Sequence, residues 1–251
     1  MQSNPARRCT VSRLGLMEYK PAWDMQRRLV EACRERGEQH LLLLEHPPTY
    51  TLGARGKQEH LLLGEPALAQ LGATVHRIDR GGDITFHGPG QLVGYPILDL
   101  ANWGQGPLWY VRSLEAVLID ALASFDIDAT RTPGRPGVWV DGAKIASIGV
   151  RISRGVTSHG FALNVDPALT FFSHIVPCGL PGVSMTSMAK AFAAGKGSPR
   201  AILGDQMVAP TILMTAVTEA VVDAFARVFE LELQDGERIV SPAAWTPAAA
   251  R

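Results

Sequence analysis

A glycine-rich stretch from Arg80 to Leu100, with the sequence RGGDITFHGPGQLVGYPILDL, constrains the fold of this chain more than any other segment. Its glycines and prolines are interleaved with strand-forming residues, which predicts short strands over 83–87 and 91–98 joined by a turn at 88–90. The second strand is largely apolar, so we expect it to be buried on both faces. One interpretation of the pattern is an ordinary glycine-rich hairpin.

Polar side chains at the mouth of this predicted hairpin favour a second interpretation. They converge where glycines would let a ligand approach the backbone, as in the wall of a binding pocket. His87 is therefore a candidate pocket residue, whereas His159 and His174, each taken alone, are interpreted as surface or structural residues. The polar residues of the predicted pocket wall are Arg80, Asp83, Thr85, His87 and Gln91.

The composition excludes several classes of function. Of the 251 residues, 46% are hydrophobic, and 24 Lys and Arg balance 24 Asp and Glu, so no general attraction to nucleic acid or anionic membranes is indicated. No apolar run reaches the roughly 18 residues of a membrane span, and the N-terminus MQSNPARRCT does not resemble a signal peptide. The three cysteines are far apart, which favours a reducing compartment. We therefore expect a cytoplasmic protein.

Hydrophobic periodicity predicts a single α+β domain over residues 9–240, with flexible termini at 1–8 and 241–251. The expected architecture is a mainly antiparallel or mixed sheet flanked by helices, including an antiparallel meander around the turn signal Asp141-Gly142. Helices are predicted over 21–36, 108–125 and 210–229, and strands over 10–16, 41–44, 49–52, 74–79, 138–140, 144–152 and 161–165.

Motifs for nucleotide and metal binding are absent from the sequence. It has no P-loop, no G-x-G-x-x-G in a strand-to-helix setting, no H-E-x-x-H and no paired cysteines. The segment GARGK at 53–57 lacks the required spacing and is interpreted as a loop. The histidines are scattered along the chain, so we expect no metal site.

Cys178 is the sharpest candidate for chemistry, because it lies between Pro177 and Gly179 in a predicted loop, while Cys33 is expected on the apolar face of a helix. Lys144 begins an otherwise apolar strand, and a solvent-facing lysine at a strand edge is the simpler interpretation. If Lys144 points at Cys178 instead, an ammonium about 4 Å from the sulfur is worth about 4 kcal/mol, or roughly three pKa units, at an effective dielectric near 20. Burial of the thiolate opposes part of this effect.

Several segments together resemble the lipoyl(octanoyl) transferase family, whose members move an octanoyl group from acyl carrier protein to a lysine of lipoate-dependent enzymes. The resemblance covers nearly the whole chain apart from its termini. It rests on EHPPTYTLG at 45–53, RGGDITFHGPGQLVGYPI at 80–97, AKIASIG at 143–149, HGFALNV at 159–165 and PCG at 177–179.

This resemblance implies an α/β sandwich like the catalytic domain of biotin and lipoate ligases. It also implies that Cys178 is the acyl-thioester nucleophile and that Lys144 tunes it. Asp83 departs from the family pattern, where uncharged or basic residues are usual. The implied substrate contacts are Arg80, Gly81, Gly82, Asp83, Ile84, Thr85, Phe86 and His87, together with Ser147, Ile148, Gly149, Gly160, Phe161 and Ala162.

The activity implied by the resemblance is ping-pong acyl transfer without ATP, metal or another cofactor. The donor is octanoyl-acyl carrier protein, and the acceptors are lipoyl domains of 2-oxoacid dehydrogenases and the glycine cleavage H protein. Three alternatives stay open. An ATP-dependent lipoate or biotin ligase on the same fold would need an adenylate site. A cysteine hydrolase would release free acid, and a non-catalytic acyl-carrier-binding module would not need Cys178.

Overall fold

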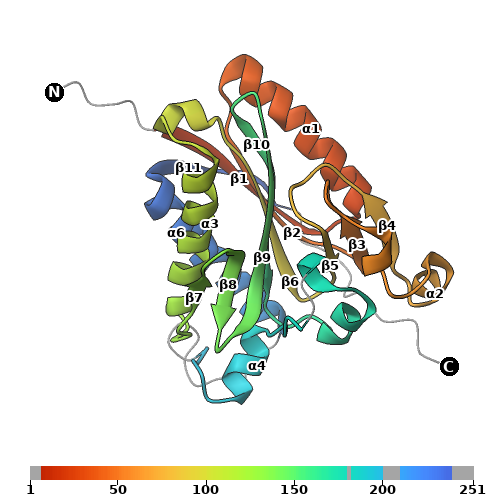
Figure 1. The fold of residues 1–251 in the computed structure, drawn as a ribbon. Helices are drawn as coiled ribbons and strands as arrows, with labels where there is room; N and C mark the ends of the chain where they lie inside the picture. Colours follow the sequence, from red (N-terminus) through yellow and green to blue (C-terminus); the bar gives the residue numbers. More distant parts are fainter. Residues whose placement is uncertain (1–6, 180–181, 200–209, 239–251) are drawn as a thin grey trace.

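The computed structural model describes residues 7–179, 182–199 and 210–238 (Figure 1). In chain order its strands are β1 (Arg7–Leu16), β2 (His40–Glu45), β3 (Thr49–Leu52), β4 (Thr74–Arg77), β5 (Ile84–His87), β6 (Gln91–Ile97), β7 (Thr130–Thr132), β8 (Arg135–Val140), β9 (Ala143–Ser153), β10 (Val156–Asn164) and β11 (Leu231–Arg238). The helices are α1 (Tyr19–Arg36), η1 (Gln58–His60), α2 (Glu65–Gln70), η2 (Leu100–Trp103), α3 (Pro107–Ala123), η3 (Leu169–His174), η4 (Pro177–Gly179), α4 (Met188–Ala193) and α6 (Pro210–Phe229).

An eight-stranded mixed sheet forms the centre of the molecule, in the order β11-β1-β2-β6-β10-β9-β8-β7. Strand β1 is parallel to β11 and β2, and the other neighbours are antiparallel. The predicted meander is confirmed as β8, β9 and β10. The sequence predicted a flexible terminus over 1–8, but Arg7 and Arg8 pair with β11 and belong to the sheet. The predicted flexible residues 1–6 and 241–251 lie outside the described part of the chain.

Helices cover both faces of this sheet, with α1 on one face and α3 and α6 on the other (Figure 1). The alternation of side chains along β2 supplies both interfaces. Leu41 and Leu43 join the core under α3 and α6, and Leu42 and Leu44 join the core under α1, all at most 2% exposed. Cys33 is buried on the inner face of α1, as expected. None of the described helices combines the length and the apolar character needed to cross a membrane.

A second, three-stranded sheet contradicts the predicted hairpin. Strand β5 pairs with β3 in the small sheet β4-β3-β5, whereas β6 pairs with β2 and β10 in the main sheet. The intervening turn is bonded elsewhere, because the Gly90 N–H donates to Glu45 Oε2 at 2.6 Å and its carbonyl accepts from the Asp166 N–H at 2.8 Å. A side chain at Gly90 would meet the Asp166 carbonyl at 2.3 Å. The glycine-rich stretch therefore joins two sheets, and β6 is buried along its whole length as predicted.

Candidate active site

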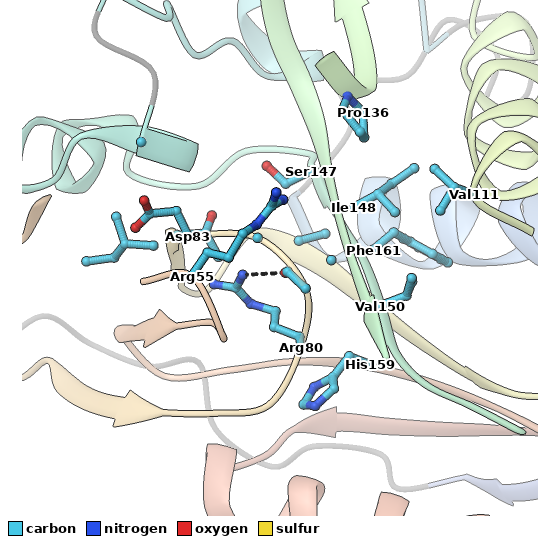
Figure 2. A pocket seen from close by; sticks show the side chains of 18 of the residues that line it. Arg55, Arg80, Asp83, Val111, Pro136, Ser147, Ile148, Val150, His159 and Phe161 are labelled. Carbon is cyan, nitrogen blue, oxygen red and sulfur yellow. Dashed lines mark hydrogen bonds between the residues drawn. The ribbon is translucent and has the colours of Figure 1, made fainter. Parts of the chain in front are cut away.

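A pocket of about 660 Å³ opens where the glycine-rich stretch meets strands β9 and β10. Its volume lies in the range of small-molecule sites. Most of the lining comes from four segments: residues 80–85, residues 134–136, the middle of β9 and the middle of β10. Figure 2 shows the apolar side chains of Val111, Ile148, Val150 and Phe161 gathered on one side of the pocket, with Arg55, Arg80 and Asp83 on the other.

The position of the pocket follows from the end of one strand pairing. Pairing between β8 and β9 stops at Val138 and Ala146, and two residues further along β8 stands Pro136, which has no N–H to offer a neighbouring strand. Further along β9, the Gly81 N–H donates to the Val150 carbonyl at 2.8 Å. Between these two points the edge of β9 is open to the pocket.

Arg80 is buried in the pocket wall, where only 7% of its surface is exposed, and its hydrogen bonds hold neighbouring segments together. Its Nη2 donates to the Thr51 carbonyl at 2.6 Å and to Thr51 Oγ1 at 2.9 Å, and its Nη1 donates to the Gly81 carbonyl at 3.0 Å. Glycines make room for this side chain. A Cβ at Gly53 would lie 2.7 Å from Arg80 Nη1, and a Cβ at Gly149 would lie 2.9 Å from Arg80 Cδ.

His87 lines the pocket as a neutral donor. Gln91 donates through Nε2 to Asn164 Oδ1 at 2.9 Å and to the Phe86 carbonyl at 3.2 Å, so its Oε1 accepts from His87 Nδ1 at 2.8 Å. Burial lowers the pKa of His87 well below its ordinary value. Gln91 itself does not line the pocket, contrary to the prediction; it orients His87 from behind.

His159 occupies the part of the wall beside Arg80 and Val150 (Figure 2). It is 2% exposed and has a backbone φ of +56°, which is strained for a residue other than glycine. Its N–H donates to Gln26 Oε1 at 2.8 Å, and its ring Nε2 lies 2.9 Å from Asp79 Oδ1. Burial, reinforced by nearby arginines, lowers the pKa of His159 to about 3, so the ring is neutral and its Nε2–H donates to Asp79. Of the two roles expected for His159, the surface one is wrong, because the residue is buried at the pocket.

Lys144 is buried at the pocket, with 2% of its surface exposed, and is not a solvent-facing edge lysine. Its Nζ donates to the Pro136 carbonyl at 3.0 Å and lies 5.0 Å from the centre of the Trp139 ring. Its backbone is fixed on the other side, since its N–H donates to the Ser184 carbonyl at 2.8 Å and its carbonyl accepts from the Thr186 N–H at 2.9 Å.

Cys178 lies in the short helix η4, and the next residue, Gly179, lines the pocket. Gly179 has φ +67°, and a Cβ there would meet Asp83 Oδ2 at 2.5 Å. Asp83 is held in place by His60, whose Nδ1 lies 2.7 Å from Oδ2, and by the Lys57 N–H at 3.3 Å from Oδ1. Asp83 thus faces the pocket and packs against Gly179 of η4.

The predicted substrate contacts all line the pocket except Phe86. Phe86 points into the core between the small sheet and η3, where its ring stacks on Phe171 at 4.8 Å and meets Tyr50 and Phe172. The alternation of a strand accounts for this outcome, because Thr85 and His87 point to the opposite side of β5.

Sequence reasoning missed several pocket residues. Tyr19 and Tyr95 are buried aromatic residues, and Arg55 is an exposed arginine in the segment interpreted as a loop. The position of His159 directly before Gly160 was the only local signal for that residue. Within the described ranges, no group of three or more His, Cys, Asp or Glu side chains could hold a metal ion.

Comparison with known proteins gives a consistent result. The model of the lipoyl protein ligase A/B catalytic domain matches residues 18–226. An octanoyltransferase from Solibacter usitatus is 46% identical, covering 94% of this chain and 99% of its own. An octanoyltransferase from Gloeobacter violaceus is 44% identical, covering 91% and 94%. The fold is that of a bipartite lipoate protein ligase from Thermoplasma acidophilum, with a TM-score of 0.62, 14% identity, and coverage of 92% of this chain and 88% of that one.

Four of the five segments that carried the resemblance, all but 45–53, contribute residues to this one pocket. Relatives above 40% identity over nearly their full length carry the same name. This chain belongs to the lipoyl protein ligase A/B catalytic domain family and, within it, to the octanoyltransferases.

Proposed function

We propose that Cys178 carries the octanoyl group as a thioester between donor and acceptor. The Cys178 thiolate attacks the donor thioester carbonyl, the tetrahedral intermediate collapses, and the donor thiol leaves with a proton. The ε-amine of an acceptor lysine then attacks the acyl-enzyme. An amide forms, the amine loses its proton, and Cys178 is released as the free thiol.

The observation that carries this proposal is the buried amine of Lys144 in the pocket that is also lined by Gly179, the residue next to Cys178. An ammonium enclosed by protein favours a nearby thiolate, because the effective dielectric there is lower than in water. The same amine can give a proton to the leaving thiol and take one from the incoming lysine. Its hydrogen bond to the Pro136 carbonyl supports the orientation that both roles require.

The acyl chain is assigned to the apolar side of the pocket, against Ile148, Val150, Phe161 and Val111. The glycines at 81, 149 and 160 bring backbone rather than side chains to the pocket wall. This arrangement supports a long, narrow substrate with a single polar end, as an octanoyl thioester has.

For partners, we assign octanoyl-acyl carrier protein as donor. The acceptors are lipoyl domains of 2-oxoacid dehydrogenases and the glycine cleavage H protein, in the cytoplasm. The relative from Thermoplasma acidophilum was studied with an E2 lipoyl domain, which is consistent with an acceptor of that kind. Acyl transfer from a thioester to an amine is favourable without ATP, unlike the reaction of a ligase.

Intact-mass measurement after mixing the protein with octanoyl-acyl carrier protein tests this function. The wild type should gain the mass of one octanoyl group, and subsequent addition of a lipoyl domain should move that mass to the acceptor with no ATP present. Cys178→Ser should gain no mass that hydroxylamine releases. Transfer that depends on ATP would identify a ligase instead, and release of free octanoate at a rate independent of the acceptor would identify a hydrolase.

A further inference from the structure

Glu115 is a buried carboxylate that the proposed chemistry does not use. It lies on α3 and is 2% exposed. Its Oε2 accepts from Arg112 Nη1 at 2.9 Å and from Arg131 Nε at 3.0 Å, and its Oε1 accepts from the Gly137 N–H at 3.2 Å. The two arginines keep 47% and 40% of their side-chain surface in solvent, whereas the Gly137 backbone is buried. Burying a carboxylate is costly even when it is paired, so a packing role alone does not account for this residue.

The Gly137 N–H belongs to the peptide group whose carbonyl is that of Pro136. A trans peptide is planar, and its N–H and C=O point in opposite directions. One end of this peptide group therefore donates to Glu115 and the other accepts from Lys144 Nζ at 3.0 Å. The orientation of the carbonyl toward Lys144 is thus set by the acceptor on the far side of the same peptide group.

Strand β7 pairs with β8 at Arg135 and at Trp139, on either side of this peptide group. Pairing of β8 with β9 ends at Val138 and Ala146, so the Gly137 N–H is not used by a β9 partner. Gly137 has φ +123°, and a Cβ there would lie 2.6 Å from the Ala146 carbonyl, so the chain turns away from β9 at a point where only glycine fits. The hydrogen bonds to Glu115 at one end and from Lys144 at the other both oppose rotation of the peptide plane.

We propose, on the basis of the acyl transfer proposed above, that Glu115 is a positioning residue for Lys144. It acts through the Pro136–Gly137 peptide group and does not touch the substrate. The hydrogen bond to Gly137, rather than the negative charge, is the functional contact. Hydrogen bonds in such a chain polarise one another, so the acceptor at one end also strengthens the bond at the other.

Two conservative variants separate the hydrogen bond from the charge. Glu115→Gln removes the charge but keeps a carbonyl oxygen of the same reach, which should face Gly137 because the half-exposed arginines can bind water instead. Glu115→Asp keeps the charge beside the arginines but withdraws the carboxylate by one methylene from Gly137. Glu219→Asp is the matched control. Glu219 is a helical glutamate of α6 that also pairs with an arginine, Arg13, at 2.7 Å.

The first measurement is the rate at which trace acetic anhydride modifies the Lys144 amine, followed by peptide mass spectrometry, with thermal unfolding measured in parallel. In Glu115→Asp, acetic anhydride should acetylate Lys144 several-fold faster than in wild type. In Glu115→Gln and Glu219→Asp, the acetylation rate should stay within twofold of the wild-type rate. This readout does not depend on any reaction of Cys178. Faster modification in Glu115→Gln with wild-type values in Glu115→Asp would overturn the proposal in favour of the charge, and equal values in all variants would also overturn it.

The second measurement is single-turnover formation of the octanoyl-enzyme against pH. Loss of one hydrogen bond should slow Glu115→Asp about tenfold and move the pH dependence upward, with recovery in Glu115→Gln. If wild-type protein formed no octanoyl-enzyme, the proposed function would fail, and the acetylation rates would still decide the role of Glu115. If the octanoyl-enzyme forms equally fast in all variants, Glu115 has no positioning role.

Discussion

At the scale of single residues, the site depends on polar groups removed from water and given one orientation. Lys144 is held by the Pro136 carbonyl at its amine and by Ser184 and Thr186 at its backbone. His87 is held by Gln91. Such groups lose little freedom when a substrate arrives, because folding has already ordered them.

Replacing Lys144 should separate charge from proton transfer. Lys144→Ala should move the pH midpoint of iodoacetamide alkylation at Cys178 upward, toward the value of about 8.5 for free cysteine. Octanoyl-enzyme formation at pH 7 should fall in parallel and partly recover at higher pH. Lys144→Arg keeps the charge but is a poor proton donor and acceptor, so it should preserve alkylation better than turnover.

Identical alkylation profiles in wild type and Lys144→Ala would show that Lys144 does not hold Cys178 as a thiolate. Cys33, buried on α1 with a pKa raised to about 11 by burial, is the internal control, because its thiol should stay unreactive in every variant.

At the scale of elements, the pocket is a gap between strands that stop pairing. Strand β9 is paired with β8 up to Ala146, and further along the strand the Val150 carbonyl accepts a hydrogen bond from the Gly81 N–H. Glycines at this point serve different purposes. Gly82 has φ +93°, so a valine there would strain the backbone, whereas Gly149 faces the Arg80 side chain. The two positions therefore differ in what a substitution tests.

Gly149→Ala is the sharper test of the pocket wall. Its Cβ would lie 2.9 Å from Arg80 Cδ and 3.1 Å from the Gly81 carbonyl, so the wall must shift by a few tenths of an ångström. We expect donor turnover to fall at least tenfold while the thermal midpoint drops by only a few degrees. Gly64→Ala is the control, because its nearest contact would be Pro66 Cδ at 3.7 Å. Wild-type turnover in Gly149→Ala would show that Gly149 is not part of the substrate wall.

At the scale of the whole molecule, a chain with no net charge carries exposed arginines at its pocket. Six arginines in or beside the pocket-forming segments are candidates for a ring around the pocket entrance: Arg77, Arg80, Arg131, Arg135, Arg151 and Arg154. Of these, only Arg80 and Arg135 line the pocket, and Arg80 is buried. Arg131 is bonded to Glu115 and Arg151 to Asp79. Arg55, from the GARGK loop, joins Arg135 as an exposed pocket arginine.

An acidic carrier protein should use these two arginines. We expect kcat/KM for octanoyl-acyl carrier protein to fall steeply between 50 and 300 mM NaCl, because the Debye length shortens from about 14 Å to about 6 Å over this range. The dependence of kcat/KM on salt should be shallower in Arg55→Ala and Arg135→Ala. Turnover of a small octanoyl thioester should depend little on salt. Arg154→Ala, altering an exposed arginine outside the pocket lining, is the control. A salt-independent donor reaction would exclude this mode of docking.

Buried histidines should make the stability of the fold pH-dependent. Burial lowers the pKa of His46 to about 4, from an ordinary value near 6.5 in the unfolded chain. Between these two values the unfolded state binds a proton that the folded state does not, so stability is full above about pH 6.5 and declines as pH falls. His46 alone should cost on the order of 2 kcal/mol at pH 5, since each unit is worth about 1.4 kcal/mol.

Urea unfolding at pH 7.5 and pH 5 measures this effect. His46→Gln should show a smaller loss of unfolding free energy between the two pH values than wild type, although it is less stable at pH 7.5. An unchanged pH dependence in His46→Gln would assign the acid sensitivity to other groups, His159 being the next candidate.

Local pattern was sufficient for much of this protein. Helical periodicity predicted α1, α3 and α6, the apolar runs predicted the buried strands β2 and β6, and the Asp-Gly signal predicted the meander. Each depends on contacts or turns between residues close in sequence, or on a stripe of apolar side chains that any core must cover. The glycines and polar residues of 80–87 likewise identified one wall of the pocket, because glycines beside polar side chains leave room for a ligand at the backbone.

Tertiary structure alone decided which strands pair and which faces meet. Strands β5 and β6 lie four residues apart in sequence yet belong to different sheets, because their hydrogen-bond partners come from β3, β2 and β10. Phe86 fell outside the pocket once β5 had joined the small sheet. Glu115 lies behind the pocket wall because α3 packs on β8. His159 lines the pocket from a position of β10 that has a positive φ. Pairing partners and buried charges depend on residues far away in the chain, and no local pattern encodes those distances.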